Sequence, residues 1–95
     1  MAIGMILEWE GGTQQQYDKV VEALGLGGKT VPGGIFHAAG PSENGWRAMD
    51  VWESEEIANA FFANNAAVFE AAGVPQPKIT VFPIHNTLTP SGPVH

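Results

Sequence analysis

The stretch GGIFHAAGPSENGWRAMDVWES, Gly33–Ser54, has the pattern of two strands joined by a turn. Residues 35–39 are a short apolar run, residues 40–45 (GPSENG) are residue types typical of turns, and residues 46–53 form a second strand-like run. A helix is then expected to begin at Ser54, because Ser is a good N-cap and two glutamates follow it in the first turn, where the helix dipole favours anions. The stretch therefore predicts a β-hairpin that leads directly into a helix.

The residues before the hairpin predict a strand and a helix. Residues 3–9 (IGMILEW) are apolar on both faces of an extended chain, which favours a buried strand. Thr13 and Gln16 have the spacing of a capping box, and Gly25 suits the left-handed position that ends a helix. Between them the apolar residues follow at helical spacing: Tyr17, Val20, Val21 and Leu24.

The residues after the hairpin complete the pattern. The helix that begins at Ser54 is expected to end near Gly73, because prolines follow at 75 and 77. Residues 78–84 (KITVFPI) predict a last strand. Because proline cannot donate to a neighbouring strand, Pro83 indicates that this strand lies at an edge of the sheet or leaves the sheet at that point.

The order β-α-β-β-α-β predicts the ferredoxin-like α+β fold, with an antiparallel sheet in one domain over residues 1–85 and an extended tail over residues 86–95. Two helices cover only one face of such a sheet. Because the first strand is apolar on both faces, a second copy of the chain is expected to cover the other face, which predicts a homodimer.

Composition excludes several classes of function. The 95 residues include ten acidic and four basic side chains, a net charge of −6 at neutral pH, which disfavours binding to nucleic acid or to an anionic membrane surface. The chain has no cysteine, so disulfides, thiolate catalysis and cysteine-bound zinc are excluded. The first apolar run is too short for a signal or a membrane span, and the cytoplasm is the expected location.

The run WRAMDVWESEEIANAFF, Trp46–Phe62, taken with the order of elements, resembles the dimeric α/β-barrel superfamily and is most similar to its small antibiotic-biosynthesis-monooxygenase-like members. That resemblance implies a dimeric α/β barrel. The superfamily includes cofactor-independent oxygenases, heme-degrading proteins, lactone isomerases and polyketide cyclases. Heme-degrading members carry a histidine on the second helix, where this chain has FFANN at residues 61–65, so no heme and no other cofactor is expected.

The polar residues of the hairpin predict a candidate site. If the chain turns at residues 40–45, Ala39 lies near Trp46, and His37 lies near Ala48. His37 and Asp50 then become diagonal neighbours on one face of the sheet. His37 would then be a general base and Asp50 its orienting group. The expected walls for a ligand are aromatic: Trp46, Trp52, Phe61 and Phe82. The structural alternative is that His37 bonds a neighbour in the core and that Asp50 caps a loop or pairs with Arg47 or Lys78.

Two further residues are candidates for ligand binding. His85 ends the last strand and is expected at the mouth of the cleft or in the dimer contact, and Glu8 lies inside an apolar strand and faces either the cleft or the dimer interface. Two histidines and a carboxylate can form a metal site, but no close HxH or HxxxH spacing supports one, and no metal is predicted.

Two classes of function follow. The first is a homodimer that binds a hydrophobic or aromatic small molecule in a sheet–helix cleft, as a cofactor-independent monooxygenase or an isomerase/cyclase. The second is a non-catalytic ligand-binding or stress-associated dimeric module in which the histidines are structural.

Overall fold

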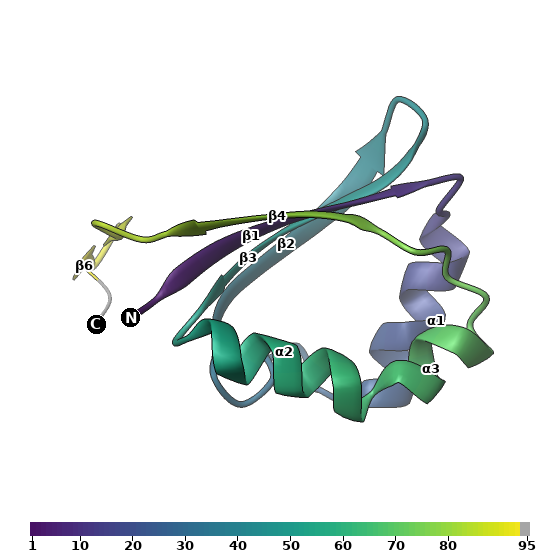
Figure 1. Cartoon of the computed structure of the whole chain (residues 1–95), viewed down its shortest axis with the longest axis horizontal. Helices are drawn as coiled ribbons and strands as arrows, with labels where there is room; N and C mark the ends of the chain where they lie inside the picture. Colours follow the sequence, from purple (N-terminus) through teal and green to yellow (C-terminus); the bar gives the residue numbers. More distant parts are fainter. Residues whose placement is uncertain (94–95) are drawn as a thin grey trace.

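The computed structural model describes residues 1–93 and has the predicted order of elements (Figure 1). The main strands and helices are β1 (Ile3–Glu10), α1 (Gln14–Leu24), β2 (Gly34–Ser42), β3 (Gly45–Trp52), α2 (Glu55–Asn64), α3 (Ala66–Ala71) and β4 (Lys78–Pro83). The four strands form one antiparallel sheet in the order β2-β3-β1-β4. This is the ferredoxin-like α+β arrangement, and β4 lies at an edge, as Pro83 predicted.

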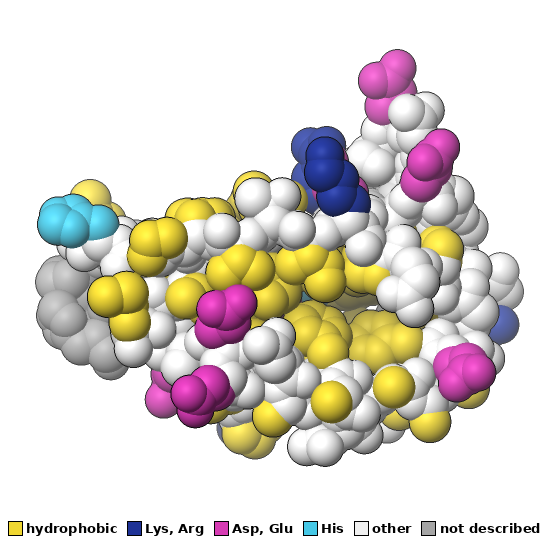
Figure 2. Space-filling model, in the orientation of Figure 1, with side chains coloured by type: hydrophobic (Ala, Val, Ile, Leu, Met, Phe, Trp, Pro, Cys, Tyr) yellow, Lys and Arg dark blue, Asp and Glu magenta, His cyan; other side chains and the backbone are white. Residues whose placement is uncertain are grey.

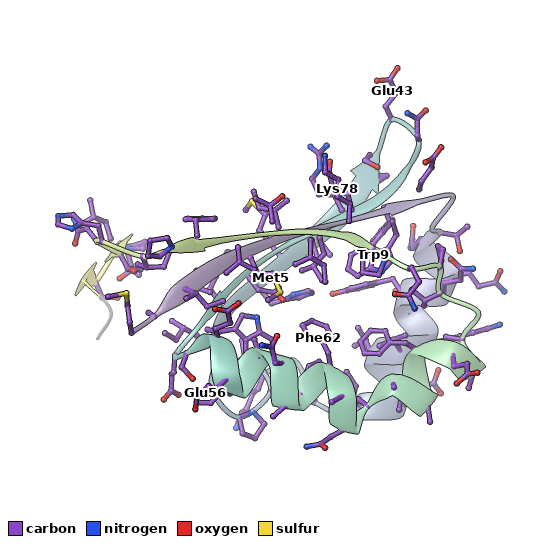
Figure 3. All side chains as sticks on the ribbon, viewed as in Figure 1. Met5, Trp9, Glu43, Glu56, Phe62 and Lys78 are labelled. Atoms are coloured by element: carbon purple, nitrogen blue, oxygen red, sulfur yellow. The ribbon has the colours of Figure 1, made fainter. Side chains whose placement is uncertain are left out.

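All three helices lie on one side of the sheet (Figure 1). Every second residue of β1 points toward them, and these residues oppose the inward residues of β3: Ile3, Met5, Leu7 and Trp9 opposite Trp52, Asp50, Ala48 and Trp46. Figure 3 shows Met5 and Trp9 pointing from the sheet toward the helices, and Phe62 of α2 pointing back toward them. The core is this layer between sheet and helices.

The β2–β3 turn is shorter than the sequence predicted. Ser42 pairs with Gly45, so only Glu43 and Asn44 connect the strands, and Pro41 is part of β2. Proline fits there because β2 is an edge strand. Gly45 is required by close approach, since a Cβ at this position would lie 2.0 Å from the Trp9 carbonyl oxygen. The register between β2 and β3 therefore differs by two residues from the prediction. Because the difference is an even number, His37 and Ala39 still point to the inner face of the sheet.

The helix termini follow the local sequence signals. Thr13 and Gln16 form the predicted capping box, Gly25 ends α1 with φ of 62°, and the Ser54 side chain accepts a hydrogen bond from the Ile57 N–H. The second helical segment is broken, however, where a single helix to Gly73 was predicted. The Asn65 side chain donates to the Phe61 carbonyl at 2.9 Å, and α3 begins after it.

The C-terminal region is more ordered than the predicted extended tail. Two short strands, β5 (Leu88–Thr89) and β6 (Gly92–Pro93), pair as a hairpin. Residues 94 and 95 lie outside the described residues. Within the described part of the chain, no helix has the length and apolar character needed to cross a membrane.

The outer face of the sheet, turned away from the helices, is apolar over most of its area. It carries Phe36, Ala38, Met49 and Val51 on one side of β1 and Phe82 on the other. Phe36 is 51% exposed, and Met49 and Phe82 are about half exposed. The sequence predicted an apolar outer face, and the structure confirms it.

Candidate functional site

A cavity of about 310 Å³ lies between the inner face of the sheet and the helices. Its walls come from β1, α1, β2, β3, the loop after α1 and the helices α2 and α3. Most of the lining is aliphatic or aromatic. Phe61, Phe62 and Phe69 pack against each other with ring centroids 5.2–6.4 Å apart, and Trp52 lies 5.4 Å from Phe61. Such a cavity suits a flat apolar molecule.

The cavity side of β4 is not covered by a helix. Ile79 and Val81 point to the same side as the core residues of β1, yet they are 48% and 38% exposed. Figure 2 shows a hollow on this side of the molecule, between the sheet and the helices, with hydrophobic side chains exposed in it. The layer between sheet and helices is therefore open to solvent on the β4 side.

A short chain of hydrogen-bonded side chains lies along this cavity. His37 of β2 lies directly opposite Asp50 of β3, and its Nδ1 is 2.5 Å from Asp50 Oδ1. The other carboxylate oxygen, Oδ2, accepts a hydrogen bond of 3.2 Å from Trp52 Nε1. On the far side of the imidazole, His37 Nε2 is 2.6 Å from the hydroxyl of Tyr17, which comes from α1. Four side chains from three elements are thus joined in one line.

Asp50 is only 7% exposed, and two N–H donors face its carboxylate. A buried carboxylate without such partners would be strongly disfavoured. The two-residue turn sets this contact, because the pairing of Ser42 with Gly45 brings His37 opposite Asp50 on the inner face. The bulge in β2 lies beyond the pair, between Gly34 and Phe36.

The hydroxyl of Tyr17 is held in its neutral form. Burial raises the pKa of Tyr17 above its ordinary value, and the negative charges of Asp50 and then Asp18 raise it further. Tyr17 also packs on Trp46, with centroids 5.3 Å apart, and its ring is nearly parallel to that of His37. Tyr17 lies in the apolar stripe predicted for this helix, and the sequence pattern did not identify it as a site residue. A usable signal was present, since it is the only tyrosine of the chain and its stripe had to face the sheet.

Five of the eight residues predicted for the site line the cavity: His37, Asp50, Trp46, Trp52 and Phe61. Two others lie on the opposite face of the sheet. Glu8 alternates with the inward residues of β1 and forms an ion pair with Arg47, with 2.6 Å between Oε1 and the guanidinium. Phe82 is paired with Gly4 on the outer face, and its ring covers that glycine. The predicted wall role of Phe82 is therefore wrong.

The remaining residue, His85, is exposed after β4 and does not line the cavity. The structural alternative for Asp50, a pairing with Arg47 or Lys78, is also wrong, because both cations point to the outer face. Figure 3 shows Lys78 turned away from the helices. Among residues 1–93, no three His, Asp or Glu side chains are grouped so that they could hold a metal ion.

No protein-family model and no curated protein sequence matches the chain. Solved structures do match it. A Chloroflexus aurantiacus protein provisionally named as an antibiotic biosynthesis monooxygenase superposes with a TM-score of 0.60 at 16% identity, over 88% of this chain and 94% of that one. A monooxygenase of Streptomyces coelicolor in complex with the ligand nanaomycin D gives 0.58 at 22% identity, over 94% and 91% of the two chains.

A third structure, from Deinococcus radiodurans and with the same provisional name as the first, gives a TM-score of 0.57 at 10% identity, over 94% of this chain and 97% of that one. Similarity at these identities is informative about the fold. It confirms the predicted resemblance at that level: the chain has the ferredoxin-like α+β fold of the antibiotic biosynthesis monooxygenases.

Proposed function

We propose that this protein binds a small, flat, hydrophobic molecule in the cavity and removes a proton from it, as a cofactor-independent monooxygenase or an isomerase/cyclase. The observation that carries the proposal is the line of hydrogen bonds from Asp50 through His37 to Tyr17 inside a mostly apolar cavity. The Streptomyces coelicolor protein of the same fold, which holds nanaomycin D, supports the ligand class.

A base paired with a buried carboxylate is what proton abstraction requires. The carboxylate orients the imidazole and stabilises the imidazolium that forms when a proton arrives. A ligand that fills the cavity displaces water from its apolar walls, so the resulting substrate anion meets little solvent on the side of the helices. In a monooxygenase reaction without a cofactor, dioxygen oxidises that anion: a CH₂ group becomes a carbonyl, one oxygen atom enters the product, and the other leaves as water.

One observation favours the second class, a non-catalytic ligand-binding module. Both ring nitrogens of His37 already have partners within the protein, as in a histidine that is part of a structural network. The two classes share the cavity and differ in whether the bound molecule reacts.

The test uses 1,8-dihydroxyanthrone, a flat phenolic molecule whose CH₂ group is oxidised to a carbonyl by dioxygen. Catalysis predicts oxygen consumption and anthraquinone formation above the protein-free rate, with a loss of about 10²–10⁴-fold in the H37Q variant, the range typical of a general base. Binding measured by calorimetry without any acceleration would support the non-catalytic module. The absence of both binding and turnover would contradict both classes.

We also propose that the protein is a homodimer in which the outer faces of two sheets pack together. The exposed apolar residues of this face have no cover within the described chain. The charge of this face also favours a second copy. Arg47 and Lys78 lie there beside Glu8, so the chain's excess of negative charge lies elsewhere, and two such faces can pack together without strong repulsion. Location in the cytoplasm stays a prediction.

A further inference from the structure

The direction of each hydrogen bond in the site follows from the chemistry of its members. The carboxylate of Asp50 can only accept, and the indole Nε1 of Trp52 can only donate. Asp50 Oδ2 therefore accepts from Trp52, and Oδ1 accepts from His37 Nδ1 at 2.5 Å. In the neutral imidazole, the single proton is consequently on Nδ1.

The second nitrogen of the imidazole is then an acceptor. His37 Nε2 carries no proton, so the hydroxyl of Tyr17, 2.6 Å away, donates its only proton to it. The oxygen of Tyr17 keeps its accepting capacity. Between Tyr17 and Asp50, each donor proton points toward Asp50, and the oxygen of Tyr17 at the open end of the line is an acceptor.

His37 has no free nitrogen to offer a ligand, because both are bonded within the protein. Tyr17 is placed differently. It lies on the α1 wall of the cavity and packs on Trp46 at 5.3 Å, one of the aromatic residues of the opposite wall. A molecule in the cavity therefore meets the phenolic oxygen of Tyr17 at the end of the line.

We propose that Tyr17 is the catalytic residue that touches the ligand, accepting first a hydrogen bond and then a proton from a phenolic hydroxyl, while His37 stores the transferred proton and Asp50 positions His37. This inference rests on the proposed function and assigns the ligand a hydrogen-bond donor at this point. An ether or ketone in the same place has no proton to give.

The proton transfer balances without any other reactant. The O–H bond of the ligand breaks as a new O–H bond forms on Tyr17, and the former Tyr17 proton moves to His37 Nε2. The ligand becomes an anion, and His37 becomes an imidazolium beside Asp50. Tyr17 is neutral before and after the step, in agreement with its raised pKa.

The experiment compares two probes of nearly the same shape, 2-naphthol and 2-methoxynaphthalene, which differ in the donor. Calorimetry on the wild-type protein should show 2-naphthol bound about tenfold more tightly, the effect of one hydrogen bond. The Y17F variant keeps the ring and loses the acceptor, so it should bind both probes equally. H37Q keeps the Tyr17 oxygen and should keep a preference for 2-naphthol.

The other results overturn the inference. If Y17F retains or increases the preference for 2-naphthol, the freed Nε2 of His37 is the acceptor and Tyr17 only covers it. If the wild-type protein binds both probes equally, Tyr17 has no such role, although the proposed binding function stands. If neither probe binds, the proposed function fails as well.

A second measurement does not depend on any variant. Nitrogen-15 NMR of the ligand-free protein reports which nitrogen of neutral His37 carries the proton. A proton on Nδ1 supports the direction of the line from Tyr17 to Asp50. A proton on Nε2 reverses it, makes Tyr17 a donor toward the cavity, and overturns the inference.

Discussion

Replacing Asp50 by asparagine tests the site at its buried end. The amide has the shape of the carboxylate but one donor and one acceptor group in place of two acceptors. If its oxygen accepts from His37, its NH₂ group faces the N–H of Trp52 and leaves that donor without a partner. If its oxygen accepts from Trp52, its NH₂ group donates to His37 Nδ1, and the imidazole proton must move to Nε2.

The free energies favour the second orientation. A buried donor without a partner costs about 1–3 kcal/mol, which is absent when the amide is turned toward Trp52. In either orientation, the two hydrogen bonds of residue 50 are no longer made to a charged group, which loses about 1 kcal/mol for each bond. A neutral amide is easier to bury than a carboxylate, and this offsets part of the loss. We expect D50N to lower the free energy of unfolding by about 1–2 kcal/mol. For a domain of this size, that lowers the Tm by about 4–16 °C.

The assay combines denaturant unfolding with nitrogen-15 NMR of His37. The matched control is D18N, the same chemical change at the other aspartate, which is exposed on α1 and should alter the free energy of unfolding by less than about 0.5 kcal/mol. D50N should also remove the preference for 2-naphthol, because Tyr17 then donates toward the cavity and the oxygen of either probe can accept its proton. A D50N protein of wild-type stability with the proton still on Nδ1 would refute the assignment of hydrogen bonds at Asp50.

Three further outcomes are expected. Because the pKa of Tyr17 is raised in the folded state, the unfolded chain loses this proton first, near pH 10.0, and folding stability falls as the pH rises from there through the folded pKa. Tyrosinate absorbance, from the only tyrosine, should show a midpoint above 10.0, and a midpoint at or below it would contradict the burial of the hydroxyl. V20F fills the cavity from α1 and should abolish 2-naphthol binding while the protein stays folded by circular dichroism; retained affinity would place the ligand elsewhere. M49K places a charge on the outer face, and sedimentation should change from two chains to one, whereas an unchanged mass would exclude this face as the dimer contact.

Much of the fold could be predicted because local signals agreed with the global pattern. The capping box at Thr13, the glycine at 25 and the Ser54 cap each define a helix terminus by a backbone requirement that few residue types meet. The edge position of β4 followed from Pro83 in the same way. These features depend on residues that are close in the sequence, so tertiary contacts had little influence on them.

The errors lie where the local signal was ambiguous. Pro41 indicates a turn as readily as an edge strand, and only the sheet order decides between them. Asn65 interrupts the second helical segment through a side-chain bond to Phe61, which spacing alone does not reveal. For the site, alternation grouped His37 with Asp50 correctly, whereas the contact with Tyr17 depends on how α1 packs across the sheet. The apolar stripe of α1 indicates that Tyr17 faces the sheet, but it does not indicate which residue of the sheet Tyr17 contacts.

The position of α1 therefore decides whether the hydroxyl of Tyr17 meets His37 in the cavity. Gln16, next to Tyr17, uses both ends of its amide: Oε1 accepts from the Thr13 N–H at 3.1 Å, and Nε2 donates to the Gly73 carbonyl at 2.9 Å. One side chain thus caps the start of α1 and ties it to the end of the helical segment that covers the cavity. Because protein hydrogen bonds have donor–acceptor distances of no more than about 3.2 Å, a small displacement of α1 would separate Tyr17 from His37. The capping box consequently has a second role, in that it helps to hold the hydroxyl of Tyr17 within hydrogen-bond distance of His37.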